Sequence, residues 1–348
     1  MKILGIETSC DETAAAVVEN GTKIISNIVA SSISLHAATG GIIPETAARQ
    51  QVFTIIPIVE KALKKTPEID AIAVTIGPGL VGSLLVGIET AKTLANLWDN
   101  HLIPVNHLVG HIYANWLTPN SKLKTKNSKL PEFPILALVV SGGHTDLVLM
   151  KGHGNLKWIG GTRDDAAGEA FDKTARLLGL GYPGGPAISL AAEKYFGQSS
   201  TIKHKPLKMF PRPMISENNF DWSFSGLKTA VARELTNKKI DKSSAPRLAA
   251  EIQEAITDVL VEKTLNAAKL YKPKSLLIAG GVAANIRLRE KFEHEIRKRK
   301  MKMLFHVPPV ALCTDNASYI ASCAFFNFSP VSWKTISANP QLTIAGES

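Results

Sequence analysis

Apolar residues near the start of the chain come in short runs, separated by small polar turns. Runs of this length and spacing predict strands and helices that alternate along the chain. Asn20-Gly21 separates two such runs and is typical of a two-residue hairpin turn. Pro44 fits the first turn of a long amphipathic helix. The predicted elements are strands at 2–6, 14–18, 23–29 and 69–76 and helices at 44–64 and 84–98.

The same pattern starts again at Pro134, where an apolar run to Val140 is followed by a small polar turn and a second strand to Met150. This repetition predicts a duplicated α/β fold, although two unrelated hairpins would give the same pattern. Two such lobes, with a ligand held between their first turns, are the architecture of actin, Hsp70 and the sugar kinases. The expected division is an N-terminal lobe at 1–120, a C-terminal lobe at 130–328 with a helical insertion at about 186–270, and a flexible tail at 329–348.

Length and composition agree with a two-lobed globular protein. The 348 residues exceed what one core usually holds, and 45% of them are hydrophobic. No apolar run reaches the roughly 20 residues that span a bilayer. The N-terminus lacks the pattern of a secretory signal, and three cysteines give no disulfide framework. A cytoplasmic location is therefore expected.

Positive charge is in excess and clustered. The net charge is +10, which suits a phosphate-rich partner, although a solvated surface would explain it equally well. The clusters are Lys122, Lys124, Lys126 and Lys129; Lys203, Lys205 and Lys208; Lys238, Lys239 and Lys242; and Arg297, Lys298, Arg299, Lys300 and Lys302.

Two histidines provide the first candidate chemistry. His107 and His111 follow a short predicted strand and are four residues apart at the start of a predicted helix. Residues at this spacing share one helix face, which can offer two nitrogen ligands to a metal. A short pattern of this kind more often marks two partly exposed histidines, so a third ligand is needed. Asp315 precedes the last predicted helix, where capping that helix is its simplest role.

Small polar turns provide the second candidate chemistry. Ser141-Gly142-Gly143-His144 ends a buried strand, and Gly184-Gly185 forms a sharp turn that allows close approach of a ligand. Asp172 is too polar for a core face without a partner. Asn285 follows a double glycine and can bond a ribose hydroxyl or cap a helix. Asp165 is expected to cap the helix that runs to Leu178.

Ten short motifs, in their order and spacing, give the chain a specific resemblance. From about Ile3 to about Phe328, it resembles the tRNA N6-adenosine threonylcarbamoyltransferase family, and its bacterial members in particular. The motifs are GIETSCDET, GGIIPE, GPGL, NHLVGH, VSGGHT, DDAAGEAFDK, YPGG, FSGLK, AGGVAAN and CTDN. The resemblance implies the actin–Hsp70–sugar kinase fold with a central cleft.

The resemblance also implies ligands and partners. One divalent metal, iron with zinc as the alternative, would be held by His107, His111 and Asp315. The substrate threonylcarbamoyl-AMP would be bound by Val139, Val140, Ser141, Gly142, Gly143, Asp172, Gly185 and Asn285, with Thr8, Ser9 and Glu12 nearby. The threonylcarbamoyl group would pass to the adenosine next to the anticodon, at position 37, in tRNAs that read codons beginning with A, and AMP would leave. A related dimerisation subunit and a small ATPase would be partners.

The chain departs from the bacterial pattern at two places. Val109 stands where relatives often have Glu, and Gln50 and Gln51 stand where many have His. No residue is a compelling general base, with His144 the weak candidate. Three alternatives remain: a small-molecule kinase on the same fold, a binding subunit without activity, and a metallopeptidase. The peptidase motif requires Glu directly after the first histidine, where this chain has Leu108.

Overall fold

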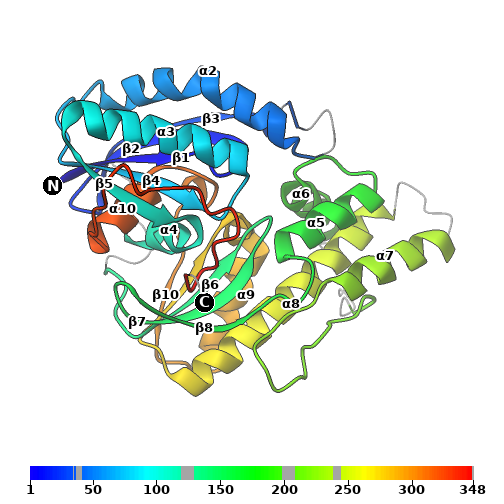
Figure 1. Cartoon of the computed structure of the whole chain (residues 1–348). Helices are drawn as coiled ribbons and strands as arrows, with labels where there is room; N and C mark the ends of the chain where they lie inside the picture. The colour runs from blue at the N-terminus through cyan, green and yellow to red at the C-terminus, as the bar shows by residue number, and fades with distance from the viewer. Residues whose placement is uncertain (34, 37–40, 119–128, 198–207, 238–243, 347–348) are drawn as a thin grey trace. The chain divides into compact units, whose positions relative to one another are not determined.

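The computed structural model describes residues 1–33, 35–36, 41–118, 129–197, 208–237 and 244–346. They form two compact units (Figure 1). The first comprises Met1–Glu132, Met150–Lys157 and Pro308–Ser348, and the second comprises Phe133–Leu149 and Trp158–Val307. The lobes expected at 1–120 and 130–328 follow chain order, whereas the observed units do not. Within the described residues, no helix is long and apolar enough to cross a membrane.

The sheet of the first unit combines an antiparallel meander with two parallel strands. Its order is β3-β2-β1-β4-β5. β1 pairs antiparallel with β2 and parallel with β4, which in turn pairs parallel with β5. The hairpin predicted at Asn20-Gly21 is confirmed, since both residues have the positive φ that such a turn needs. The strands are β1 (Lys2–Glu7), β2 (Glu12–Glu19), β3 (Lys23–Ser31), β4 (Ala71–Gly77) and β5 (His101–Asn106).

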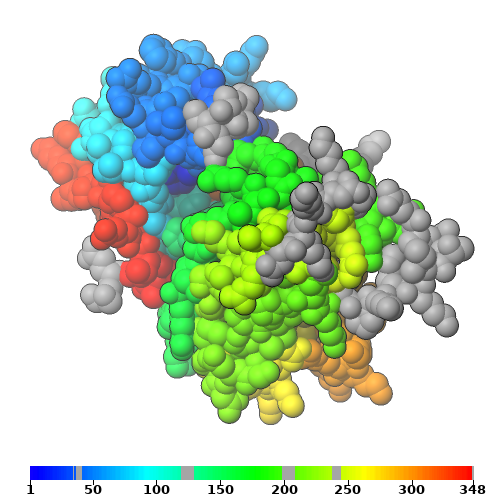
Figure 2. Space-filling view, turned by 90° about the vertical axis from the view of Figure 1, so that its right-hand side faces the viewer, coloured from blue at the N-terminus to red at the C-terminus, as the bar shows by residue number. Residues whose placement is uncertain are grey.

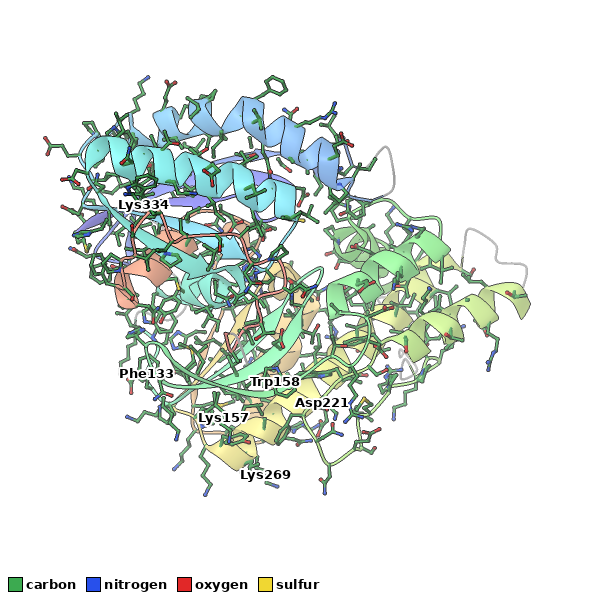
Figure 3. All side chains as sticks on the ribbon, in the orientation of Figure 1. Phe133, Lys157, Trp158, Asp221, Lys269 and Lys334 are labelled. Carbon is green, nitrogen blue, oxygen red and sulfur yellow. The ribbon has the colours of Figure 1, made fainter. Side chains whose placement is uncertain are left out.

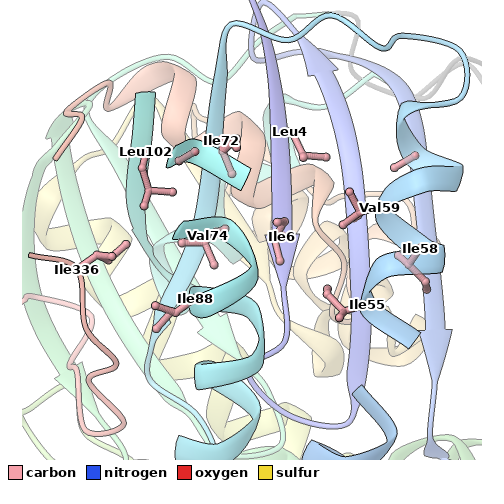
Figure 4. Packing of buried hydrophobic residues seen from close by; sticks show 14 of the residues in the cluster. Leu4, Ile6, Ile55, Ile58, Val59, Ile72, Val74, Ile88, Leu102 and Ile336 are labelled. Atoms are coloured by element: carbon pink, nitrogen blue, oxygen red, sulfur yellow. The ribbon is translucent and has the colours of Figure 1, made fainter. Parts of the chain in front are cut away.

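Alternation along β1 sends its side chains to two different layers. Leu4 and Ile6 pack under helices α2 (Pro44–Leu63) and α3 (Val81–Trp98) in the core of this unit (Figure 4). Gly5 and Glu7 point to the opposite face, because side chains alternate along a strand. Helix α10 (Ser318–Phe326) packs on that face. A Cβ at Gly5 would lie 2.3 Å from the Ala317 carbonyl oxygen, so only glycine permits this approach. This packing explains why the end of the chain belongs to the first unit.

The expected tail also packs on the first unit. Ile336 and Ile344 are buried. The backbone N–H of Val331 donates to the Leu102 carbonyl at 2.9 Å, and that of Asn339 donates to the Ile76 carbonyl at 2.7 Å. Residues 329–346 therefore lie along β4 and β5.

The sheet of the second unit repeats the strand order of the first. Its order is β10-β9-β6-β7-β8, so β6 takes the place of β1, and β9 pairs parallel with it as β4 does with β1. The predicted duplication is thereby confirmed. The strands are β6 (Ile135–Val140), β7 (Thr145–Gly152), β8 (Asn155–Gly161), β9 (Ser275–Ala279) and β10 (Leu304–His306).

Helices form most of the rest of the second unit. Its helices are α5 (Ala167–Leu177), α6 (Gly184–Gly197), α7 (Ser225–Asn237), α8 (Ala245–Tyr271) and α9 (Ile286–Lys298), with the short 3₁₀ helix η2 (Gly281–Ala284). The range expected as a helical insertion holds α6, α7 and α8. Figure 2 shows, in yellow-green, the surface formed by residues 208–237. The irregular part before α7 is fixed to the end of β8, because Trp222 N–H donates to the Gly161 carbonyl at 3.0 Å. Asp221 (Figure 3) also pairs with Arg163, just after β8, at 2.9 Å.

Candidate metal centre and substrate turns

Helix α4 (His107–Tyr113) begins directly after β5, as predicted. Asn106 caps it, since its Oδ1 accepts hydrogen bonds from the N–H groups of Leu108 and Val109 at 2.9 and 3.3 Å. Such a cap satisfies amides that have no partner inside the helix. The cap places His107 at the first helical position, with His111 one turn later. Asn106 Nδ2 also donates to the Thr343 carbonyl at 2.7 Å, so the end of the chain contacts the start of this helix.

The first unit brings the three predicted metal ligands together. His107 Nε2 lies 3.7 Å and His111 Nε2 lies 3.4 Å from Asp315 Oδ1. One ligand atom from each residue lies within 4.8 Å of the others. Asp315 does not cap α10, because the cap residue is Ala317 and has no side-chain hydrogen bond. The geometry therefore favours a ligand role for Asp315 over capping.

Burial and charge give the three groups unusual proton affinities. Burial alone would lower the pKa of His107, but Glu7 and Asp315 outweigh it and raise that pKa to about 9. Burial, and then the neighbouring His107, lowers the pKa of His111. Burial opposes ionisation of Asp315, but the charge of His107 and contact with His111 hold its pKa well below the usual range. A metal would therefore displace a proton from His107 on binding.

The donor set fits a divalent metal. Both ring nitrogens of His111 are buried, and neither makes a hydrogen bond within the described part of the chain. Nε2 faces Asp315 Oδ1 at 3.4 Å without hydrogen-bond geometry, and a cation bound there would satisfy both buried groups. Two imidazoles and one carboxylate suit iron or zinc and leave positions open for further ligands.

Sequence reasoning missed two residues that surround this cluster. Glu7 is fully buried and its Oε2 lies 3.0 Å from His107 Nδ1. The Tyr319 hydroxyl donates to Asp315 Oδ1 at 3.4 Å, and its ring lies 4.7 Å from that of His111. Glu7 did carry a signal, because it is the one charged residue within the apolar run at 3–7. Tyr319 lies in an apolar helix and carried none.

The turn after β1 holds Thr8 and Ser9, and Glu12 follows it as the first residue of β2 in the same unit. Gln51 Nε2 donates to the backbone carbonyls of Cys10 and Glu12 at 2.9 and 3.0 Å and so fixes the turn. Ser9 Oγ lies 3.2 Å from His107 Nδ1. Thr8 and Ser9 are buried, and burial raises the pKa of Glu12 to about 7 against an opposing hydrogen bond from Ser31. A substrate role for the three stays a prediction.

The turn after β6 exposes backbone rather than side chains. Val139 and Val140 are fully buried, so only their main chain can meet a ligand. Gly142 and Gly143 are exposed, and a Cβ on either would meet nothing within 4 Å. The turn is closed by the Ser141 N–H, which donates to the His144 carbonyl at 2.9 Å.

Helix α5 holds this turn and the start of α6. Gly168 N–H donates to the Ser141 carbonyl at 3.1 Å. Asp172 Oδ1 accepts from Gly184 N–H at 2.7 Å and so fixes the first turn of α6. The sharp turn predicted at Gly184-Gly185 is wrong, because both residues belong to this helix. Burial raises the pKa of Asp172. The prediction that Asp165 caps α5 is wrong, because the cap residue Ala166 makes no side-chain bond; Asp165 pairs with Lys173 at 2.6 Å.

Asn285 does cap α9, and it has further partners. Its Oδ1 accepts from Leu288 N–H at 2.9 Å. Its Nδ2 donates to Ser189 Oγ and Gln253 Oε1 at 2.9 and 3.0 Å. Within the second unit, these contacts form a continuous series. Asn285 contacts α6, α6 contacts Asp172 of α5, and α5 contacts the turn after β6. Sequence reasoning missed Ser189 and Gln253.

Solved structures of distant proteins share the fold. HypF from T. kodakarensis is similar to 94% of this chain over 48% of its own length, with a TM-score of 0.58 and 14% identity. Full-length HypF in its phosphate- and nucleotide-bound form is similar to 95% of this chain over 56% of its own length, with a TM-score of 0.57 and 11% identity. The expected actin–Hsp70–sugar kinase fold is confirmed.

Comparisons of sequence are more specific. The family model of TsaD, tRNA N6-adenosine threonylcarbamoyltransferase, matches residues 23–322. The tRNA N6-adenosine threonylcarbamoyltransferase of Dehalococcoides mccartyi is 51% identical over 332 residues, which cover 94% of both chains. That of Bacillus cereus is 48% identical over 350 residues, which cover 98% of this chain and 96% of its own. This chain belongs to the family of tRNA N6-adenosine threonylcarbamoyltransferases, enzymes that act on tRNA.

Proposed function

We propose that this enzyme takes the threonylcarbamoyl group from threonylcarbamoyl-AMP. The acceptor is the adenosine N6 at position 37, next to the anticodon, in tRNAs that read codons beginning with A, and AMP is released. The observation that carries the proposal is the buried cluster of His107, His111 and Asp315, with the unsatisfied nitrogens of His111. We place the reaction in the cytoplasm, because its substrate is tRNA.

The metal of this site is iron, with zinc as the alternative, and its chemistry is to polarise an oxygen or neutralise developing negative charge. The other roles belong to residues of the second unit. The exposed amides of Gly142 and Gly143 can donate to phosphate oxygens as charge develops on the leaving AMP. Asp172 and Asn285 orient hydroxyl groups of the intermediate. The backbone of Val139, Val140, Ser141 and Gly185 completes the pocket.

The nucleophile requires little activation by the protein, because a mixed anhydride already has a good leaving group. His144 is therefore a weak candidate base, and its N–H donates to Ser141 Oγ at 3.2 Å, which fits a role in shaping the turn. Leu108 stands where a zinc peptidase needs its carboxylate, and it is buried. The peptidase alternative thus lacks a water activator, and the kinase alternative does not use the histidine pair.

Basic residues of the second unit supply salt-dependent affinity for tRNA phosphates. A groove of about 1070 Å³ is lined by α8, α9 and the segment before α7. Its cations are Lys208, Arg212, Arg287, Lys291, Lys298 and Arg299. Most of them pair with carboxylates, whereas Lys208 is exposed and has no ion pair within the described residues. Lys208→Glu should weaken tRNA binding and reduce its salt dependence. The lysines at 122, 124, 126, 203, 205, 238, 239 and 242 lie outside the described residues.

The protein partners are a related dimerisation subunit and a small ATPase. Helix α2 carries a candidate partner-binding face of the first unit. Its apolar side chains Val52, Phe53 and Ile56 are 60%, 77% and 50% exposed. Exposed apolar side chains grouped on one helix are typical of an interface. We assign this face to the dimerisation subunit. Phe53→Asp should abolish co-elution with that subunit on gel filtration, and unchanged co-elution would contradict the assignment.

The deciding experiment is reconstitution. The enzyme, its partners, threonylcarbamoyl-AMP and unmodified tRNA should give the modified adenosine, detected by mass spectrometry of nucleosides. His111→Ala should abolish the product, and so should removal of metal with a chelator, with recovery when iron or zinc is added back. Full activity of either preparation would contradict the metal role.

A further inference from the structure

Glu7 is a carboxylate with no exposed surface, held on the face of β1 that α10 covers. Its Oε1 accepts the Ser9 N–H at 2.6 Å. Its Oε2 accepts the Thr75 hydroxyl at 2.6 Å and lies 3.0 Å from His107 Nδ1. A buried charge is tolerated only when it is paired and hydrogen-bonded, and these three contacts meet that condition.

These contacts fix the orientation of the His107 ring. Nδ1 faces Glu7, whereas Nε2 faces Asp315 at 3.7 Å. A ring that donates its Nδ1 proton to a carboxylate presents the lone pair of Nε2 to a metal. A carboxylate behind a metal-binding histidine also makes the imidazole a stronger ligand.

The second histidine has no comparable support. His111 Nδ1 is buried and makes no hydrogen bond within the described part of the chain. The two rings therefore differ, although they lie on the same helix face with centroids 4.5 Å apart. This difference indicates that Glu7 contributes specifically to the ligand at position 107.

We propose that Glu7 is a positioning residue of the metal site: it holds the His107 ring with Nε2 toward the ion, and Thr75 and Ser9 hold Glu7. The inference rests on the metal role proposed above. The competing interpretation is that Glu7 only pairs with His107 to stabilise the fold, with no effect on metal binding.

The test is the affinity of the metal-free, full-length protein for Zn²⁺, measured by competition with a chromophoric chelator. Glu7→Gln keeps the size of the side chain and removes its charge. It should weaken Zn²⁺ binding by about 10–100-fold, the usual effect of losing such a partner. Asp70→Asn is the matched control, because Asp70 accepts the Lys2 N–H at 2.6 Å near the other end of β1. This control should bind Zn²⁺ as the parent does.

Two further measurements separate positioning from folding. The absorption bands of bound Co²⁺ should shift in Glu7→Gln, because they report the field of the ligands. Thr75→Val removes only the hydroxyl that holds Glu7 and should also weaken Zn²⁺ binding; it decides the matter if Glu7→Gln fails to fold. If Glu7→Gln folds, parent-like Zn²⁺ affinity and an unchanged Co²⁺ spectrum would overturn the inference. If Glu7→Gln does not fold, parent-like Zn²⁺ affinity of Thr75→Val would overturn it.

Failure of the inference is distinguishable from failure of the proposed metal role. If His111→Ala loses Zn²⁺ binding and Glu7→Gln does not, only the role of Glu7 is refuted. If the parent itself binds no Zn²⁺ at this site, the metal role is refuted, and the role of Glu7 with it.

Discussion

Replacement of Gly168 by alanine should displace the turn that exposes Gly142 and Gly143. A Cβ at position 168 would lie 2.4 Å from the Ser141 carbonyl oxygen and 2.7 Å from the Gly142 Cα. Real Cβ atoms essentially never approach other atoms more closely than 3.0 Å. Both contacts are backbone atoms, which cannot rotate away, so the turn and α5 must separate by at least roughly half an ångström.

Two magnitudes follow from that displacement. Overpacking of this kind costs about 1–3 kcal/mol of unfolding free energy. A misplacement of reacting groups that approaches 1 Å costs up to roughly 100-fold in rate. Gly168→Ala should therefore lose more activity than its loss of stability explains, because most of the protein remains folded at the assay temperature.

The assay pairs urea unfolding with the rate of adenosine modification at saturating tRNA. Gly152→Ala is the control, since a Cβ there meets nothing within 4 Å and its φ is ordinary. It should leave both quantities nearly unchanged. A Gly168→Ala enzyme with parental stability and rate would refute the close packing of α5 on this turn.

Three further predictions concern the second unit. Burial would raise the pKa of Glu254, but Arg287 and Lys291 hold it below its ordinary value of 4.5. Glu254→Gln should therefore lower the free energy of unfolding by about 1–3 kcal/mol near pH 7. This loss should shrink as the pH falls through the lowered pKa, and a loss that did not shrink would contradict the assignment. Asn285→Asp keeps the cap of α9 but loses the Nδ2 hydrogen bonds to Ser189 and Gln253. Binding of threonylcarbamoyl-AMP, measured by calorimetry, should therefore fall by more than the loss of thermal stability explains; a binding loss no larger than the stability loss would mean that Asn285 acts only in the fold. Asp164 accepts hydrogen bonds from Ser223 and Ser225 at the start of α7, so Asp164→Ala should speed proteolysis within residues 208–237, and parental cleavage rates would argue against this anchor.

Local patterns predicted helix α4 because each signal lies close in sequence. The i, i+4 spacing of His107 and His111 and the strand before them specified α4, and the repeated strand–turn–strand pattern specified the duplication. Asp315 could not be derived in this way. Its position depends on α10 packing against Gly5, a contact between residues some three hundred positions apart.

Partners of the candidate residues were the least predictable part. The capping oxygen of Asn285 follows from local sequence, but its bonds to Ser189 and Gln253 depend on how α6 and α8 pack. Asp165 had the right type and nearly the right position for a cap, yet Lys173, two turns along the same helix, provides an ion pair instead. Propensity describes what a side chain can do, and tertiary contacts select one of the available bonds.

The return of the chain to the first unit has a consequence for biosynthesis. His107 and His111 leave the ribosome within five residues of each other, whereas Asp315 follows only after the entire second unit, Trp158–Val307 included, has been translated. The nascent chain therefore cannot bring the three side chains together early. Under the proposed metal role, a chain would acquire its three-ligand site only after α10 has packed on β1.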